Sequence, residues 1–150
     1  MAVTLAVHLL AAVVWVGGMF FAHVALRPSA SMLAVPERVR LWEAVLRRFM
    51  VWVWISVISL LVTGYWMIIV EYGGYEYAGT HVRVMHGVGW FMILLFFYVF
   101  FVLFRRMRRF ISQHLFPEAG MVMERIRLVV TINLILGLLT STIASAGRFW

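Results

Sequence analysis

The sequence contains no cysteine, no lysine and no aspartate. The absence of cysteine excludes disulfides, thiolate metal sites and iron–sulfur clusters. Charged residues make up only 13% of the 150 residues and hydrophobic residues make up 65%, which is far outside the range of soluble proteins. This scarcity of charge excludes a soluble globular domain and indicates an integral membrane protein.

Four uncharged runs are long enough to cross a bilayer, whose hydrocarbon core requires about 20 helical residues. They cover residues 2–26, 49–70, 84–104 and 128–147. Because these runs occupy most of the chain, no length remains for a soluble domain. The sequence therefore predicts an all-α fold, an integral membrane four-helix bundle that forms one transmembrane domain over residues 1–150.

The basic residues, all of them arginine, lie mostly in two of the three connections between the predicted spans. Five follow the first span and six follow the third, whereas the connection 71–83 has two glutamates and one arginine (the two groups are Arg27, Arg38, Arg40, Arg47 and Arg48, and Arg105, Arg106, Arg108, Arg109, Arg125 and Arg127). Because cytoplasmic loops carry the excess of arginine, we expect both termini on the periplasmic side of a bacterial inner membrane. The arginine-rich loops are expected to contact anionic lipids rather than nucleic acid.

The connection after the first span includes a predicted amphipathic segment. Pro28 discourages continuation of the first helix, and residues 36–48 space apolar side chains helically among charges. We expect this segment to lie on the inner membrane surface as a short helix.

One face of the first span is chemically distinctive. His8, Ala12, Trp15, Met19 and His23 fall within an arc of roughly 80° at 100° per residue. Since lipid offers no hydrogen-bond partner, this stripe should point into the bundle. An ionisable residue inside a membrane is a candidate functional residue, and a neutral imidazole is a good ligand for haem iron and for copper.

The third span has two histidines on different faces. His81 shares a face with Met85 and Met92, whereas His86 lies roughly 140° away, with Trp90. In an antiparallel bundle either one reaches the depth of His8, so either could complete a pair with it. The periodicity alone leaves both choices open.

A pair of histidines on facing helices could ligate a b-type haem from both sides. Trp15 is predicted to pack against the macrocycle, and Arg83 or Arg148 is predicted to pair with its propionates. His23 lies about 22 Å deeper than His8 by helical rise. It is predicted either to hold a second site or to bond to Asn133.

Copper is the alternative metal for the same face. Cuprous copper prefers soft ligands. One sparse ladder of such ligands can be drawn, with His8, Met19 and His23 on the first span and His81, Met85 and Met92 opposite on the third. A haem site needs fewer ligand side chains and a more extensive aromatic lining, and 16% of the residues are aromatic. From composition we therefore prefer haem b and a membrane oxidoreductase over copper uptake or tolerance. A third hypothesis is an accessory subunit without a cofactor.

Several stretches resemble a known family. "HLLAAVVWVGGMFF", "LRRFMVWVWISVISLLVTGYWMI", "GTHVRVMHG" and "RIRLVVTINLILGLLTSTIASAGRFW" are together similar to the short stand-alone form of the CopD copper-resistance membrane proteins. The layout also resembles HemJ, a small helical membrane protein with haem. The CopD resemblance implies copper movement or tolerance with histidine and methionine ligands, and the HemJ-like layout implies a haem held by helix histidines. Expected partners are the bilayer and a membrane or periplasmic redox or copper-carrier protein, and the pattern is compatible with an oligomer.

Overall fold

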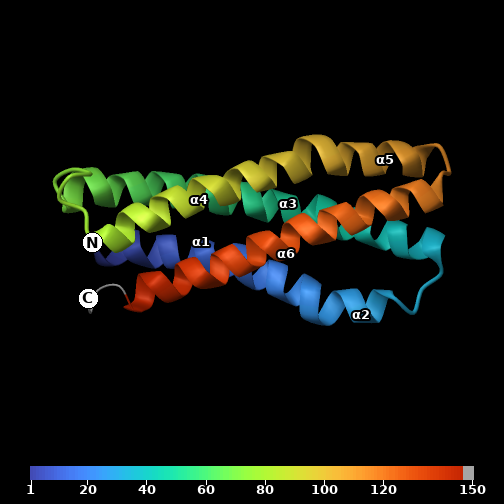
Figure 1. Cartoon of the computed structure of the whole chain (residues 1–150), viewed down its shortest axis with the longest axis horizontal. Coiled ribbons are helices and arrows are strands. Elements are labelled where there is room, and N and C mark those ends of the chain that lie inside the picture. Colours follow the sequence, from blue (N-terminus) through green and yellow to red (C-terminus); the bar gives the residue numbers. More distant parts are fainter. Residues whose placement is uncertain (147–150) are drawn as a thin grey trace.

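Four long antiparallel helical runs make up the structure, a computed structural model that describes residues 1–146 (Figure 1). The runs cover Ala2–Ala30, Val35–Glu71, Thr80–Ser112 and Phe116–Ala146, and each is long and apolar enough to cross a membrane. No strand occurs in this part of the chain. The predicted all-α four-helix membrane bundle is thereby confirmed.

Each run is built from named elements. The first contains α1 (Ala2–Phe21), the π-helical η1 (Ala22–Leu26) and α2 (Arg27–Ala30), and the second contains α3 (Val35–Trp66) and η2 (Met67–Glu71). The third contains α4 (Thr80–Tyr98), η3 (Val99–Phe104) and α5 (Arg105–Ser112), and the fourth is α6 (Phe116–Ala146). The N-terminus, the 72–79 loop and the end of α6 lie together at what we call the terminal end (Figure 1). We call the opposite end, with the two arginine-rich connections, the arginine-rich end.

The first helical run continues past Pro28, contrary to the expectation that this proline would end it. Proline has no backbone N–H and so removes one rung of the helical ladder. The chain widens into the π-helical η1 just before it, where Arg27 N–H donates to the Ala22 carbonyl, and α2 then begins with Pro28 in its first turn. The irregular backbone lies at His23, which is part of η1.

The segment 36–48 is not a separate surface helix but the first part of α3. Its apolar positions Val39, Trp42 and Leu46 are buried in the protein core rather than turned toward a membrane surface. The helical spacing predicted from the sequence is present, but neighbouring helices cover this face. The break before α6 falls at residues 113–115, and Pro117 lies in the first turn of α6, where its missing N–H costs nothing.

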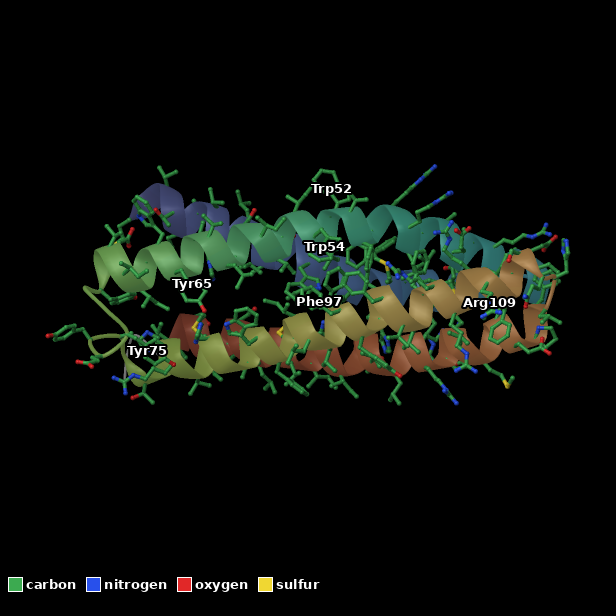
Figure 2. The ribbon with its side chains drawn as sticks, turned by 90° about the horizontal axis from the view of Figure 1, so that it is seen from above. Trp52, Trp54, Tyr65, Tyr75, Phe97 and Arg109 are labelled. Carbon is green, nitrogen blue, oxygen red and sulfur yellow. The ribbon has the colours of Figure 1, made fainter. Side chains whose placement is uncertain are left out.

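An aromatic cluster joins α3 to the third run at mid-bundle. Trp54 stacks on Phe97 with ring centroids 5.4 Å apart and meets Phe96 and Phe100 edge to face. Figure 2 shows Trp54 and Phe97 between the two helices, whereas Trp52 points outward. Many other large apolar side chains are exposed on the bundle surface, which suits contact with lipid.

Candidate functional site

His8 lies against α3, near the terminal end. Its Nδ1 atom is 2.8 Å from the Thr63 hydroxyl oxygen, and its Cε1 atom lies over the backbone of Gly64, 3.5 Å from where a Cβ would stand. Thr63 is buried and His8 is half-buried. A Cβ at Gly64 would make an ordinary van der Waals contact with the ring, so the imidazole lies directly against the helix.

The Thr63 hydroxyl determines which nitrogen of His8 carries the hydrogen. A hydroxyl has one proton, and Thr63 donates it to the Ser59 carbonyl at 2.6 Å. Its oxygen is then an acceptor toward His8, so Nδ1 must be the donor. In the neutral imidazole this leaves Nε2 with a free lone pair, which is the arrangement of metal-binding histidines, whose other nitrogen donates to a neighbouring acceptor.

His23, in η1 just after the end of α1, is held in the same way by α6. Its Nδ1 atom is 3.3 Å from the hydroxyl oxygen of Thr131, and Thr131 donates its proton to the Arg127 carbonyl at 2.8 Å. The same proton count makes Nδ1 of His23 the donor and leaves Nε2 free. The prediction that His23 bonds to Asn133 is wrong, because the partner is Thr131, which lies two residues earlier.

The two histidines of α4 have different surroundings. His86 Nε2 lies 3.2 Å from the donor Nε1 of Trp90 and 3.1 Å from the Tyr65 hydroxyl, so its lone pair is engaged in hydrogen bonds. Figure 2 shows Tyr65 pointing from α3 toward α4. His81 lies over Gly79, with its Nδ1 2.9 Å from the position of a Cβ there. The hydrogen bond of His8 thus goes to Thr63 of α3, whereas those of His86 go to Tyr65 of α3 and to Trp90 of its own helix.

A narrow cavity of about 60 Å³ lies inside the bundle toward the arginine-rich end. His23, Met19 and Trp15 line it from α1 and η1, Met50 from α3 and Asn133 from α6. Trp15, Met19, Met50 and Asn133 are each at most 4% exposed. The Asn133 Oδ1 atom is buried without a hydrogen-bond partner, so the cavity wall offers an unused oxygen acceptor beside an imidazole and two thioethers.

The remaining predicted site residues are not gathered at one place. Arg83 donates to the Glu76 carbonyl at 2.8 Å and lies over the Tyr75 ring, so it belongs to the loop at the terminal end. Met85 is half-buried on α4. Arg148 lies outside the described residues. Within residues 1–146 no three side chains among histidine, cysteine, aspartate and glutamate form a metal-binding group.

Thr63, Thr131 and Met50 are site residues that the sequence pattern does not predict. The pairings of His8 with Thr63 and of His23 with Thr131 span 55 and 108 residues. A threonine within an apolar helix was the available signal. Its histidine partner could be known only from the helix packing.

Comparison with known proteins gives one family match. Residues 43–146, more than half of the chain, match the family described as CopD, copper resistance protein D. The matched range begins within α3 and leaves the first helical run, with His8 of α1 and His23 of η1, outside it. No curated protein and no solved structure matches the chain. The chain belongs to the CopD family, as its sequence resemblance predicted.

Proposed function

We propose that this protein binds copper ions inside its helix bundle and carries them across the membrane, with copper as the cargo. The supporting observation is the shared arrangement of His8 and His23, each of which donates Nδ1–H to a threonine and keeps the Nε2 lone pair free. Copper accepts imidazole nitrogen and, as Cu(I), thioether sulfur. The family's association with copper resistance agrees with this choice of metal.

The two histidines would form two copper-binding stations along the first helical run. His8 is the station at the terminal end. The second station uses His23 with the thioethers of Met19 and Met50 and the amide oxygen of Asn133, which line the inner cavity. Most residues that line this cavity are apolar, with Arg27 and Arg127 as the charged exceptions. A cuprous ion with soft ligands loses less hydration energy there than a hard divalent ion would.

Haem is the weaker candidate. A haem ligated from both sides needs His8 and an α4 histidine to face each other, but the lone pair of His86 is engaged by Trp90 and the ring of His81 lies over Gly79. The family description names copper and not haem. Copper therefore replaces haem, which the amino-acid composition had favoured, as the ligand that we propose.

Copper binding is tested with purified protein titrated anaerobically with Cu(I) against a competing chelator dye. We expect the wild type to bind two ions, and His8→Ala and His23→Ala to lose one each. His114→Asn is the control, because His114 is an exposed loop residue at φ 59°, a conformation that asparagine accepts. Cu(I) uptake by proteoliposomes should fall in both histidine variants. A red preparation whose Soret band disappears in His8→Ala, or unchanged copper binding in both variants, would refute the proposal.

A further inference from the structure

A second cavity, of about 330 Å³, opens at the arginine-rich end and has a different character. Three arginines from three different helical elements line it, namely Arg27 of α2, Arg38 of α3 and Arg127 of α6. The single carboxylate in its wall is that of Glu124, which pairs with Arg127. Its volume is at the lower end of small-molecule sites, which begin at about 300 Å³.

Only one of the three guanidinium groups, that of Arg127, has a carboxylate partner among the described residues, namely Glu124. Arg27 and Arg38 form no ion pair with any described residue, and both repel the charge of Arg127. The Nε atom of Arg127 is buried without a hydrogen-bond partner, although the side chain as a whole is 17% exposed. Like charges held together around a cavity favour an anion between them, and guanidinium groups bind phosphate with paired N–H donors.

Exposed apolar residues lie beside the arginines of this cavity. Val24, one turn before Arg27, is 53% exposed, and Leu128, next to Arg127, is 63% exposed. Val24 lies near the end of one uncharged run that is predicted to cross the bilayer, and Leu128 begins another. Arginines at the end of such runs lie at the depth of lipid phosphates. A phosphate bound here would therefore have acyl chains beside it.

We propose that Arg27, Arg38 and Arg127 form a binding site for the headgroup of one anionic phospholipid, whose acyl chains lie against the exposed apolar residues next to the cavity. A lipid headgroup and a free phosphate ion would both bind these arginines through a phosphate group. The flanking Val24 and Leu128 favour the lipid. This site is separate from the histidine stations, and its existence does not rest on the proposed function.

The site also adjoins the inner cavity of His23. Arg27 and Arg127 line both cavities, and Arg127 lies four residues, about 6 Å along the helix, from the Thr131 that holds His23. An anionic headgroup would offset positive charge close to the proposed inner copper station. The lipid would thus make the neighbouring cavity more favourable for a cation.

The test measures lipid binding directly and needs no copper. The full-length protein in a neutral detergent is titrated with phosphatidylglycerol or with phosphatidylcholine of the same acyl chains, and bound lipid is counted by native mass spectrometry while Tm is recorded. We expect one phosphatidylglycerol to remain bound and to raise Tm. The double variant Arg27→Gln/Arg38→Gln should bind it at least about 10-fold more weakly, since each arginine near a lipid surface contributes roughly a 5-fold factor.

The control is Arg109→Gln/Arg125→Gln, which removes the same charge at the same end of the molecule from residues that do not line the cavity. Figure 2 shows Arg109 at that end. Arg127 is left intact because it pairs with Glu124 and lies over the Trp42 ring. The single variant Arg38→Lys keeps the charge but loses the planar donor pair, so it should bind with intermediate affinity if the double variant fails to fold.

Two results would overturn the proposal. Equal loss in the test and control variants would mean that the lipid is attracted only by the diffuse charge of this end. An equal rise in Tm with inorganic phosphate or glycerol phosphate, without acyl chains, would make the cavity a site for soluble anions instead.

Discussion

The Nδ1 atom of His8 lies 2.8 Å from Oγ1 of Thr63, and this one hydroxyl determines which ring nitrogen of His8 remains free. The hydroxyl proton is already donated to the Ser59 carbonyl, so the oxygen can only accept from the ring. The same relationship recurs between His23 and Thr131. Two histidines of the first helical run are therefore oriented by two different neighbouring helices, α3 and α6, with the same ring nitrogen left free.

The threonines can be tested without touching the proposed ligands. Thr63→Val and Thr131→Val keep the side-chain volume but remove the acceptor, so the imidazole loses its fixed tautomer and orientation. We expect Cu(I) affinity to fall about 10- to 100-fold at the His8 station for Thr63→Val and at the His23 station for Thr131→Val, as for other partners of ligating histidines. Competition titrations with a chelator dye measure both.

Thr140→Val is the matched control for these variants. Thr140 donates to the Leu136 carbonyl at 2.8 Å, as Thr63 and Thr131 do to theirs, but no histidine is bonded to it. Copper binding should be unchanged. If Thr140→Val lowers the affinity as much as the other two, the effect comes from a general change in helix packing and not from the histidine tautomer.

We expect His86 to stabilise the fold rather than to bind copper. Its Nε2 is engaged by Trp90 and Tyr65, and Trp90 Nε1 also lies 3.3 Å from the Tyr65 hydroxyl. Tyr65→Phe removes the hydroxyl and should lower the free energy of unfolding by about 1 kcal/mol, without change in the number of copper ions bound. Thermal denaturation and metal analysis check the two parts. Loss of one ion in His86→Ala would instead make His86 a ligand.

We expect Asn133 to lower the stability of the copper-free protein while it contributes to copper binding. Its Oδ1 is buried without a partner, and such an atom costs about 1–3 kcal/mol. Asn133→Leu has nearly the same shape, so it should raise the Tm of the copper-free protein while it weakens Cu(I) binding at the His23 station. A lower Tm, or an unchanged copper affinity, would show that Asn133 is not part of that station.

The approach of α1 to α6 depends on Gly137. A Cβ at this position would lie 2.7 Å from Val16 Cγ2 and 3.2 Å from Met92 Cε, and the branched valine has little freedom to move. Gly137→Ala should lower the free energy of unfolding by about 1–3 kcal/mol. Gly87→Ala, which meets nothing within 4 Å, should be neutral or slightly stabilising in the same denaturation assay. Equal effects of the two would contradict the close contact.

The lipid and copper sites should be coupled. If an anionic headgroup offsets the charges of Arg27 and Arg127, Cu(I) should bind at the His23 station more tightly in nanodiscs containing phosphatidylglycerol than in phosphatidylcholine nanodiscs. The His8 station, which lies far from these arginines, should show no such difference and serves as the internal reference. The difference at His23 should diminish in Arg27→Gln/Arg38→Gln. Lipid binding without this difference would leave the headgroup site intact and refute only the coupling.

The amino-acid sequence by itself determined the fold class and the number of spans, because only uninterrupted apolar helices satisfy their backbone hydrogen bonds inside a bilayer. Helical periodicity also placed Trp15 and Met19 on an inward face, and both are buried. These features follow from short-range spacing, which a single helix already contains.

The packing of the helices determined every feature that depends on contacts between two or more of them. It set Thr63 beside His8 and Thr131 beside His23, turned His86 toward Tyr65, and brought Met19, Met50 and Asn133 around one cavity. It also joined residues 36–48 to α3, because their apolar face packs onto neighbouring helices. Sequence periodicity gives the direction of a side chain around its own axis, but the rotation, depth and partner of each helix depend on how all four fit together.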